Sequence, residues 1–576
     1  MLFEHLSFLY GETNAPLIYS RLITLLNRFK QGHPELVILD NKEKINEKDV
    51  ILITYGDMVR DEGEKPLKTL GRLLKDYLVD LINTIHILPF YPFSSDDGFA
   101  VIDYRHVNPE FGSWSDISQL NRDFRLMFDA VINHCSTQSA MFQGFLQCDP
   151  DKEDFFTTVE SNTDLSKVFR PRATPVVTPF MTKDGEKLVW TTFSTDQVDL
   201  NFKNPDVLFE MLDIILFYVL HGAEFIRLDA VTYVWKELGT NCINLPQTHR
   251  FVQLMRTVLD IVAPHVVIIT ETNVPHKDNI AYFGDGTNEA QLVYNFALPF
   301  LTLHSFLSGN IKFLSDWAKT LDVPSQQTTF FNFLACHDGI GVLPVKGILP
   351  ESEVEKVIQH VQAKGGFISY KSNEDGTKSP YELNINYLDA ICPSDTKEKN
   401  QETVAKRFLT SHAIMLSLRG VPGIYFHSLF GSKNWKEGVE QTGRNRTINR
   451  QKLNIKNLIA ELSDSNSIRY IIFKGFTKLL RARRENYAFH PFGKQKIIDL
   501  HPSVFSLIRI SPNEDSKILC LHNVGGQSIE LSIDLQKIKI EKNAAFKCIL
   551  TNENISPSNG ILKLRIMPYE ILWLKF

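Results

Sequence analysis

The sequence predicts a (β/α)8 barrel, a closed ring of eight parallel strands alternating with helices, followed by an all-β domain. Eight short, mostly apolar segments recur between residues 50 and 426, with helical stretches between them. Alternation of strands and helices favours a parallel sheet, and eight strands favour its closure into a barrel. After about residue 490 the pattern changes to short strands of alternating polarity, which are typical of an all-β module.

The expected elements begin with a helical extension. Residues 1–48 carry leucines and aromatic residues at helical spacing, which predicts helices that precede the barrel. The eight expected barrel strands are 50–55, 84–89, 126–132, 225–228, 266–270, 292–296, 328–334 and 421–426. The expected strands of the C-terminal module are 503–509, 517–522, 561–566 and 570–574.

Two intervals between barrel strands are longer than a loop requires, and long intervals of this kind are usually functional or separately folded. We expect a small inserted domain at 135–224, after the third strand, and a second at 346–398, after the seventh. The other predicted domains are barrel parts at 49–134, 225–345 and 399–488 and the β domain at 489–576.

Composition excludes several classes of protein. The 576 residues carry a net charge of −5, which argues against a nucleic-acid partner. The seven cysteines form no CxxC pair, so neither a zinc ribbon nor a disulfide framework is indicated. The N-terminus lacks the pattern of a signal peptide, and the apolar stretch 212–220 is too short for a membrane span, so we expect a cytoplasmic protein. The basic run 478–484 reads as the solvated face of a helix.

Three of the expected strands are followed, at once or within four residues, by an acidic residue. These acids are Asp229, Glu271 and Asp338. In a barrel of this kind the carboxyl ends of the strands carry the chemistry. Three acids that converge there indicate glycoside chemistry, with one nucleophile, one general acid/base and one residue that stabilises the sugar's transition state. The alternative for any single acid is a helix cap or an ion pair with a neighbouring base.

Four segments carry a resemblance to a known family. Residues 129–134, 227–230, 271 and 337–338 match, in order, the signature regions of the α-amylase clan, glycoside hydrolase family 13. Segments 95–99, 170–172, 337–341 and 448–450 resemble its sucrose phosphorylase-like branch. Over nearly its whole length, including 190–194, 269–284 and 379–387, the chain is most similar to the glucosylglycerate phosphorylases.

The resemblance implies a glycosyltransferase-type hexosyl phosphorylase with a retaining mechanism. Its expected reaction is reversible phosphorolysis of 2-O-α-D-glucosylglycerate to α-D-glucose 1-phosphate and D-glycerate, through a β-glucosyl-enzyme. Asp229 would be the nucleophile, Glu271 the general acid/base and Asp338 the transition-state stabiliser. Retention predicts that the carboxyls of Asp229 and Glu271 lie about 5–5.5 Å apart.

The resemblance also implies a set of binding residues. The expected substrate-binding residues are Asp96, Phe99, His134, Arg227, His337, Glu382 and Arg450. Arg172 and Tyr233 are expected to bind phosphate, Arg172 because a guanidinium forks onto phosphate oxygens. Each has a simpler reading: the histidines as core residues, Phe99 as a filler of the barrel mouth and Arg172 as part of a surface salt bridge.

Several alternatives stay open. Sucrose phosphorylases carry Tyr-Gln where this chain has Tyr381 and Glu382, which puts sucrose in doubt. Glu382 would bind acceptor hydroxyls, or point away while Arg444 or Arg446 binds the carboxylate of glycerate. Sucrose, sucrose 6′-phosphate or glucosylglycerol phosphorylase, an α-glucoside hydrolase or transglucosidase, and an inactive barrel are the alternative functions. We expect the glucoside and inorganic phosphate as the only partners, no membrane partner, no cofactor and no metal, with a homodimer left open.

Overall fold

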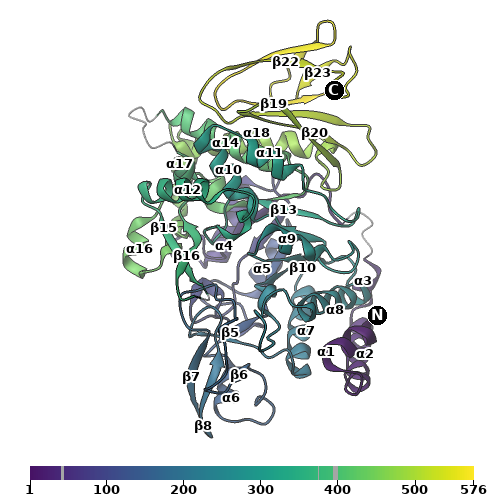
Figure 1. The fold of residues 1–576 in the computed structure, drawn as a ribbon, viewed down its shortest axis with the longest axis vertical. Coiled ribbons are helices and arrows are strands. Elements are labelled where there is room, and N and C mark those ends of the chain that lie inside the picture. Colours follow the sequence, from purple (N-terminus) through teal and green to yellow (C-terminus); the bar gives the residue numbers. More distant parts are fainter. Residues whose placement is uncertain (40–43, 374, 393–399) are drawn as a thin grey trace.

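The computed structural model describes residues 1–39, 44–373, 375–392 and 400–576, and its centre is a closed barrel of eight parallel strands (Figure 1). Each of the eight predicted strands is confirmed. Around the barrel they follow the order β1, β17, β13, β12, β11, β10, β4 and β3, which closes on β1. Their bounds are β1 Ile51–Thr54, β3 Thr84–Ile87, β4 Arg125–Val131, β10 Ala223–Asp229, β11 Val267–Thr270, β12 Leu292–Tyr294, β13 Thr329–Phe333 and β17 Val421–Tyr425.

The barrel strands are buried on both faces because helices cover their outer side. Among these helices are α4 Pro66–Tyr77, α7 Pro205–Leu220, α8 Pro246–Val262, α10 Ala297–Ser308, α14 Gln401–Ser417 and α18 Ile468–Arg484. In α4 the apolar face of Leu67, Leu70 and Leu74 is buried, whereas Lys68 and Arg72 stay exposed. Burying each leucine stabilises the fold by roughly 1.5–3 kcal/mol, which fixes this helix on the barrel.

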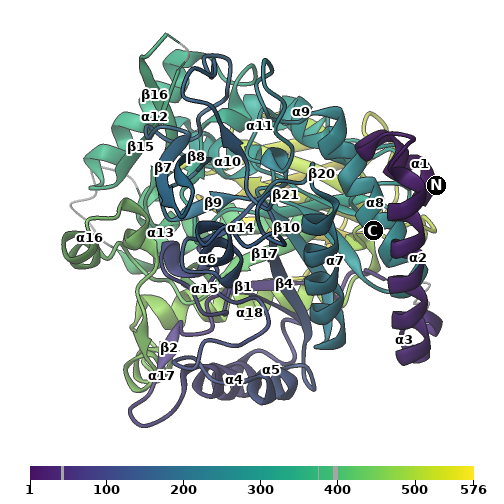
Figure 2. The same ribbon diagram turned by 90° about the horizontal axis from the view of Figure 1, so that it is seen from below.

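The N-terminal extension forms helices α1 Leu2–Tyr10, α2 Ala15–Gly32 and α3 Pro34–Ile38. They pack on the outer side of α8 and lie at one flank of the barrel (Figure 2). Residues 40–43 of the predicted extension lie outside the described residues. Tyr10, at the end of α1, contacts Trp235 of the loop after β10, with ring centroids 6.4 Å apart.

Both long intervals contain secondary structure of their own. The first holds α6 Ala140–Leu146, a sheet of β6 Thr158–Val159, β8 Gly185–Trp190 and β7 Val177–Thr182, and the pair β5 His134–Ser136 and β9 Gln197–Asp199. The second holds α12 Glu351–Ala363, β15 Phe367–Ser372, β16 Lys378–Asn384 and α13 Tyr387–Ile391. Just before it lie β14 Ile340–Gly341, which pairs with β16, and η4 Leu343–Val345. Residues 374 and 393–398 of this interval lie outside the described ones. A backbone bridge between Arg170 and Ser372 joins the two insertions.

The C-terminal domain is antiparallel, and its four predicted strands are confirmed as β20 Val504–Ile510, β21 Lys517–Asn523, β25 Ile561–Ile566 and β26 Ile571–Lys575. The pattern did not predict β19 Lys494–His501, β22 Ile529–Asp534, β23 Phe546–Cys548 or β24 Asn554–Ile555. This domain and the β6–β8 sheet lie at opposite ends of the molecule (Figure 1).

The expectation that the basic run 478–484 is solvated is confirmed for Lys478 and Arg481, which are exposed, but is wrong for Arg483. Arg483, near the end of α18, is fully buried rather than solvated. Its guanidinium donates to the backbone oxygens of Leu416 and Gly420, among others, and no acidic side chain of the described residues forms an ion pair with it. No helix of the described part of the chain is long and apolar enough to cross a membrane.

Candidate active site

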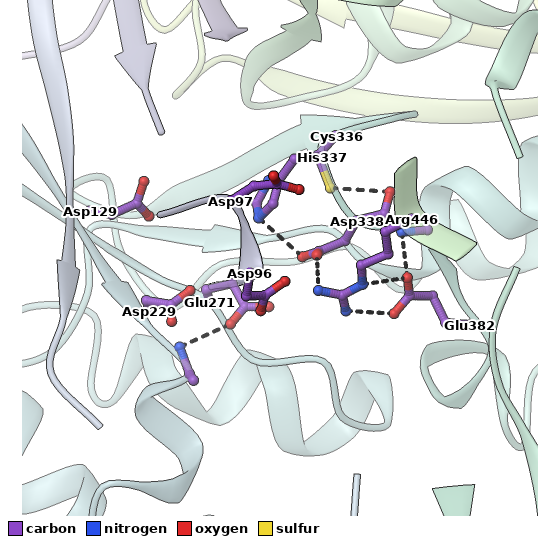
Figure 3. Close-up of polar contacts among 12 residues, drawn as sticks. Asp96, Asp97, Asp129, Asp229, Glu271, Cys336, His337, Asp338, Glu382 and Arg446 are labelled. Atoms are coloured by element: carbon purple, nitrogen blue, oxygen red, sulfur yellow. Dashed lines mark hydrogen bonds and ion pairs between the residues drawn. The ribbon is translucent and has the colours of Figure 1, made fainter. Parts of the chain in front are cut away.

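The three acids at or after the ends of strands lie together at one rim of the barrel. Asp229 is the last residue of β10, Glu271 directly follows β11, and Asp338 lies in the loop after β13. Because the strands are parallel, their carboxyl ends meet at the same rim. Figure 3 shows the three side chains around a common space. They line a cavity of about 60 Å³.

Asp229 is held by a base on its own strand. Residues two apart on a strand point to the same face, and Arg227 Nη1 donates to Asp229 Oδ1 at 2.7 Å. The register of β10 and β4 places Arg227 opposite Asp129, and these two also form an ion pair. His86 contacts the other oxygen of Asp129 at 2.7 Å. Arg227 therefore lies between two buried carboxylates and fixes the orientation of Asp229.

Glu271 lies beside Asp229 and accepts a hydrogen bond from the backbone. Ala230 N–H donates to Glu271 Oε2 at 3.0 Å, from a residue in the left-handed region (φ 48°). Such a conformation costs about 1–2 kcal/mol for a residue with a Cβ. This strained turn at Ala230 aims its N–H at the acid.

The two carboxyls titrate as a pair. Burial raises the pKa of Asp229 and the pKa of Glu271, and the charge of Glu271 adds to the effect on Asp229. The pair therefore retains one proton at pH values where isolated acids lose both. Asp229 receives a hydrogen bond from a guanidinium, whereas Glu271 receives one from a backbone N–H, and this difference favours the charge on Asp229 and the proton on Glu271. A charged nucleophile beside a protonated acid is the arrangement that retaining glycoside chemistry requires.

Asp338 is charged because of two arginines. Burial opposes ionisation, but Arg446 and Arg450 outweigh it and lower the pKa of Asp338. Arg446 Nη1 lies 2.6 Å from Asp338 Oδ1. The same guanidinium donates to both oxygens of Glu382, from Nε at 2.9 Å and from Nη2 at 2.7 Å (Figure 3). Gly339 N–H adds a third bond to Glu382 at 2.7 Å.

These contacts bear on the two roles considered for Glu382. Its carboxylate lines the cavity, but both oxygens already accept from Arg446. The side chain is 2% exposed. Its contacts in the structure therefore fit the positioning of Arg446 beside Asp338 better than direct binding of acceptor hydroxyls. Arg446, one of the two bases considered for glycerate, is committed to these two acids.

An aromatic and histidine layer forms another wall of the cavity. The rings of Phe99 and His337 stack with centroids 4.7 Å apart and planes within 5°. His134 Nε2 lies 3.0 Å from the carbonyl oxygen of Phe99. Burial lowers the pKa of both histidines, so each ring is neutral and offers one donor and one acceptor. Neutral rings of this kind suit sugar hydroxyls.

Asp96 lines the cavity, whereas Arg450 lies behind it. Arg450 Nη1 donates to Asp97 at 2.6 Å, and its Nε donates to the carbonyl oxygen of His337 at 2.8 Å. Both Asp96 and Asp97 have left-handed backbone (φ 52° and 50°), which costs of order 1–3 kcal/mol each and is typical of functional sites. Arg227 and Arg450, predicted as substrate-binding residues, thus support the lining residues from beneath.

The two residues expected to bind phosphate lie on the side of the cavity formed by the first insertion and the β10 loop. Arg172 lines the cavity, with its guanidinium 5.5 Å from the ring centroid of Phe193 and 5.6 Å from that of Tyr381. Tyr233 lines it too, and burial raises the pKa of its hydroxyl well above 10, so the hydroxyl is a neutral donor.

The structure also brings residues into the site that the sequence did not single out as site residues. These lining residues are Phe193, Gln197, Thr232, Asn273, Phe296 and Tyr381. Gln197 belongs to β9 of the first insertion and lies 3.1 Å from His134 Nε2. Nothing local in the sequence marks Gln197, whereas Asn273, two residues after Glu271, follows a strand end and offered a positional signal.

One group of three potential metal ligands occurs among the residues that the structure describes, namely Cys336, His337 and Asp338. Their ligand atoms lie within 4.8 Å of one another. Asp338 is already paired with Arg446, and burial raises the pKa of the Cys336 thiol, which disfavours the thiolate that binds metals. The chemistry of this donor set does not fit a cation.

Comparisons with known proteins agree with this geometry. Residues 72–379 match the family model described as alpha amylase, catalytic domain. A protein of Spirochaeta thermophila named glucosylglycerate phosphorylase is 50% identical over 577 residues, covering 99% of this chain and 97% of the relative. A protein of Escherichia coli K12 with the same name is 43% identical and covers 99% of both chains. The crystal structure of sucrose 6F-phosphate phosphorylase from Thermoanaerobacter thermosaccharolyticum superposes with a TM-score of 0.73 at 25% identity, covering 88% of this chain and 98% of that one.

Proposed function

This chain belongs to the glucosylglycerate phosphorylases of the α-amylase family, and on that premise we propose that it catalyses reversible phosphorolysis of 2-O-α-D-glucosylglycerate. The products are α-D-glucose 1-phosphate and D-glycerate. The observation that carries the proposal is identity of 43–50% over nearly the whole length of relatives that bear this name. The cavity with its three acids supports the same reaction class.

In the first half-reaction Asp229 attacks the anomeric carbon of the glucosyl unit. The bond from that carbon to the glycerate oxygen breaks, and Glu271 protonates the departing oxygen. The Arg227 bond at Asp229 Oδ1 leaves the other oxygen, Oδ2, for attack. Asp338, charged by its arginine neighbours, stabilises the oxocarbenium-like transition state from within the same cavity.

In the second half-reaction phosphate takes the place of glycerate. Glu271, now ionised, accepts a proton from phosphate while a phosphate oxygen attacks the anomeric carbon and Asp229 departs. Two inversions give net retention, so the product is the α-anomer. Arg172 and Tyr233 are the proposed phosphate ligands, since the first supplies charge and the second a neutral donor at the same wall.

The test is a phosphate-dependent assay for glucose 1-phosphate, run in parallel on glucosylglycerate, glucosylglycerol, sucrose and sucrose 6′-phosphate. Asp229→Asn serves as the blank. Rapid release from glucosylglycerate alone, lost in the blank, is the expected result. Release from another of these donors would retain the mechanism and replace the acceptor. Glucose formed at the same rate without phosphate would make the enzyme a hydrolase.

A cytoplasmic location stays a prediction, and a homodimeric state stays open. Subcellular fractionation tests the first, and light scattering of the purified protein tests the second. Both are independent of the reaction and leave the proposed chemistry unchanged.

A further inference from the structure

Three of the arginines near the three acids are committed to acidic partners. Arg227 lies between Asp129 and Asp229, and it supports the cavity from beneath. Arg446 is paired with Asp338 and Glu382. The third, Arg450, pairs with Asp97.

Arg172 is different. It lines the cavity, and among the residues that the structure describes no acidic side chain lies within 4.0 Å of its guanidinium. Its one hydrogen bond within the described chain goes from Nη1 to the adjacent carbonyl oxygen of Pro171, at 3.3 Å. The two aromatic rings beside it, Phe193 and Tyr381, restrict its position without neutralising it. The histidines of the cavity are neutral, so Arg172 carries the uncompensated positive charge of this lining.

Two different anions must use this charge in turn. In a retaining reaction glycerate departs from, and phosphate arrives at, the same face of the anomeric carbon. The carboxylate of glycerate is attached to the carbon that bears the departing oxygen, so its oxygens lie close to where the free phosphate oxygens will lie. An anion next to the buried Asp338 and Glu382 also needs a nearby cation to offset their repulsion.

We propose that Arg172 binds the carboxylate of glycerate in one half-reaction and phosphate in the other, and is thereby the residue that selects an anionic acceptor. This inference rests on the proposed function. A guanidinium suits both anions because its fork matches carboxylate and phosphate oxygens. It also explains how a cavity lined by several acids, Asp338 and Glu382 among them, accepts an anionic acceptor. Neutral polyols of the same size gain nothing from this charge.

The experiment separates the two anions by removing phosphate from the assay. α-D-glucosyl fluoride serves as the donor in phosphate-free buffer, because its leaving group needs neither phosphate nor a carboxylate. The measured quantity is the ratio of glucosyl transfer to D-glycerate over transfer to glycerol, both below saturation. This ratio cancels any effect on formation of the glucosyl-enzyme. In Arg172→Gln it should fall at least about tenfold, the effect of losing one charge-assisted hydrogen bond.

Two further variants sharpen the result. Arg172→Lys retains the charge without the fork and should give an intermediate ratio. Arg444→Gln is the matched control, since Arg444 is the exposed alternative base outside the cavity lining and should leave the ratio at the wild-type value. A ratio in Arg172→Gln within twofold of wild type, or a loss in Arg444→Gln instead, would overturn the inference. So would a wild-type enzyme with no preference for glycerate over glycerol.

Failure of the proposed function is seen separately. A wild-type enzyme that forms no glucose 1-phosphate from glucosylglycerate and phosphate lacks the proposed activity. This holds whatever ratio of transfer to glycerate over transfer to glycerol is measured with α-D-glucosyl fluoride. Circular dichroism and the melting temperature of each variant check that it is folded. Arg172 is half-buried in a loop and forms no ion pair with a described residue, so its replacement should not unfold the protein.

Discussion

The Arg446 guanidinium donates two parallel hydrogen bonds to Glu382, from Nε to Oε1 at 2.9 Å and from Nη2 to Oε2 at 2.7 Å, and with its remaining nitrogen it contacts Asp338. One arginine therefore joins the second insertion to an acid of the active site. Because Glu382 is fully buried, its charge depends on this pairing.

Glu382→Gln should weaken both stability and activity. The amide retains the shape but loses one charge-assisted acceptor, so we expect the free energy of unfolding to fall by about 1–3 kcal/mol. The kcat/KM for glucosylglycerate should fall as well, because Arg446 is no longer held beside Asp338. Urea unfolding and steady-state kinetics measure the two effects. Asp316→Asn, which removes the exposed partner of Lys312, is the control. Its free energy of unfolding should stay within about 0.5 kcal/mol of the wild-type value. Equal stability of the two variants would contradict the prediction.

Glu271→Gln should discriminate between leaving groups. Loss of a general acid costs about 10²–10⁴-fold when the departing oxygen needs a proton. Phosphorolysis of glucosylglycerate should fall by that factor, whereas release of fluoride from α-D-glucosyl fluoride in the first turnover should fall far less. Rapid-quench measurement of the first-turnover rate with each donor tests this difference. Equal losses on both donors would remove Glu271 from the role of acid.

The dependence of kcat/KM on pH should also report the titration of Glu271. Burial raises the pKa of Glu271, and the acid acts only when protonated. The kcat/KM for glucosylglycerate should therefore decline as the pH rises through that raised pKa, and this alkaline limb should disappear in the residual activity of Glu271→Gln. If the variant showed the alkaline decline at the same pH, the decline would belong to another residue.

Asp129 should account for much of the stability that the protein loses at acidic pH. Burial opposes its ionisation, but Arg227 and His86 outweigh it and lower the pKa of Asp129 from 3.8 to about 2. A depressed pKa contributes stability that is present above pH ~4 and is lost as the pH falls toward 2; the shift amounts to about 2 kcal/mol. Asp129→Asn should flatten the dependence of unfolding free energy on pH in this window. An unchanged slope would contradict the assignment.

The barrel and its three acids were accessible from sequence because their signals are local. A buried strand is a continuous apolar run, and Asp229 and Glu271 stand directly at the ends of such runs. The weaker strands of the C-terminal domain lacked this signal: β19 mixes lysines with isoleucines and is half exposed, so its alternation is blurred.

The partners of the site residues were not accessible in the same way. Arg446 and Glu382 are 64 positions apart and meet only because the second insertion folds over the rim. The left-handed backbone of Ala230 has no signature in an alanine. Arg483 looks like a surface residue in a basic run, and only the fold supplies the carbonyl oxygens that satisfy it. Such features depend on tertiary contacts, which no local pattern encodes.

Lys236 provides a last prediction, because its ammonium is buried between the barrel and the first insertion. Its Nζ lies 2.7 Å from Asn133 Oδ1 and 2.7 Å from Asp199 Oδ2. Removing one partner of a buried pair leaves the other charge uncompensated, at a cost of about 3–5 kcal/mol. Lys236→Met should therefore destabilise the protein by that amount in urea unfolding, and the double variant with Asp199→Asn should recover part of it.

The chain offers a matched control for Lys236→Met. Lys203 and Glu237 form a pair of similar length, 3.0 Å, but both side chains are nearly half exposed. Solvent screens such a pair, so Lys203→Met should change the unfolding free energy by less than about 1 kcal/mol. The same substitution at two lysines then separates burial from pairing as the source of the effect. If Lys236→Met were as mild as Lys203→Met, Asp199 would have to be stabilised by its bonds from Thr192 and Asn133 alone. Lys236 would then not be what joins the insertion to the barrel.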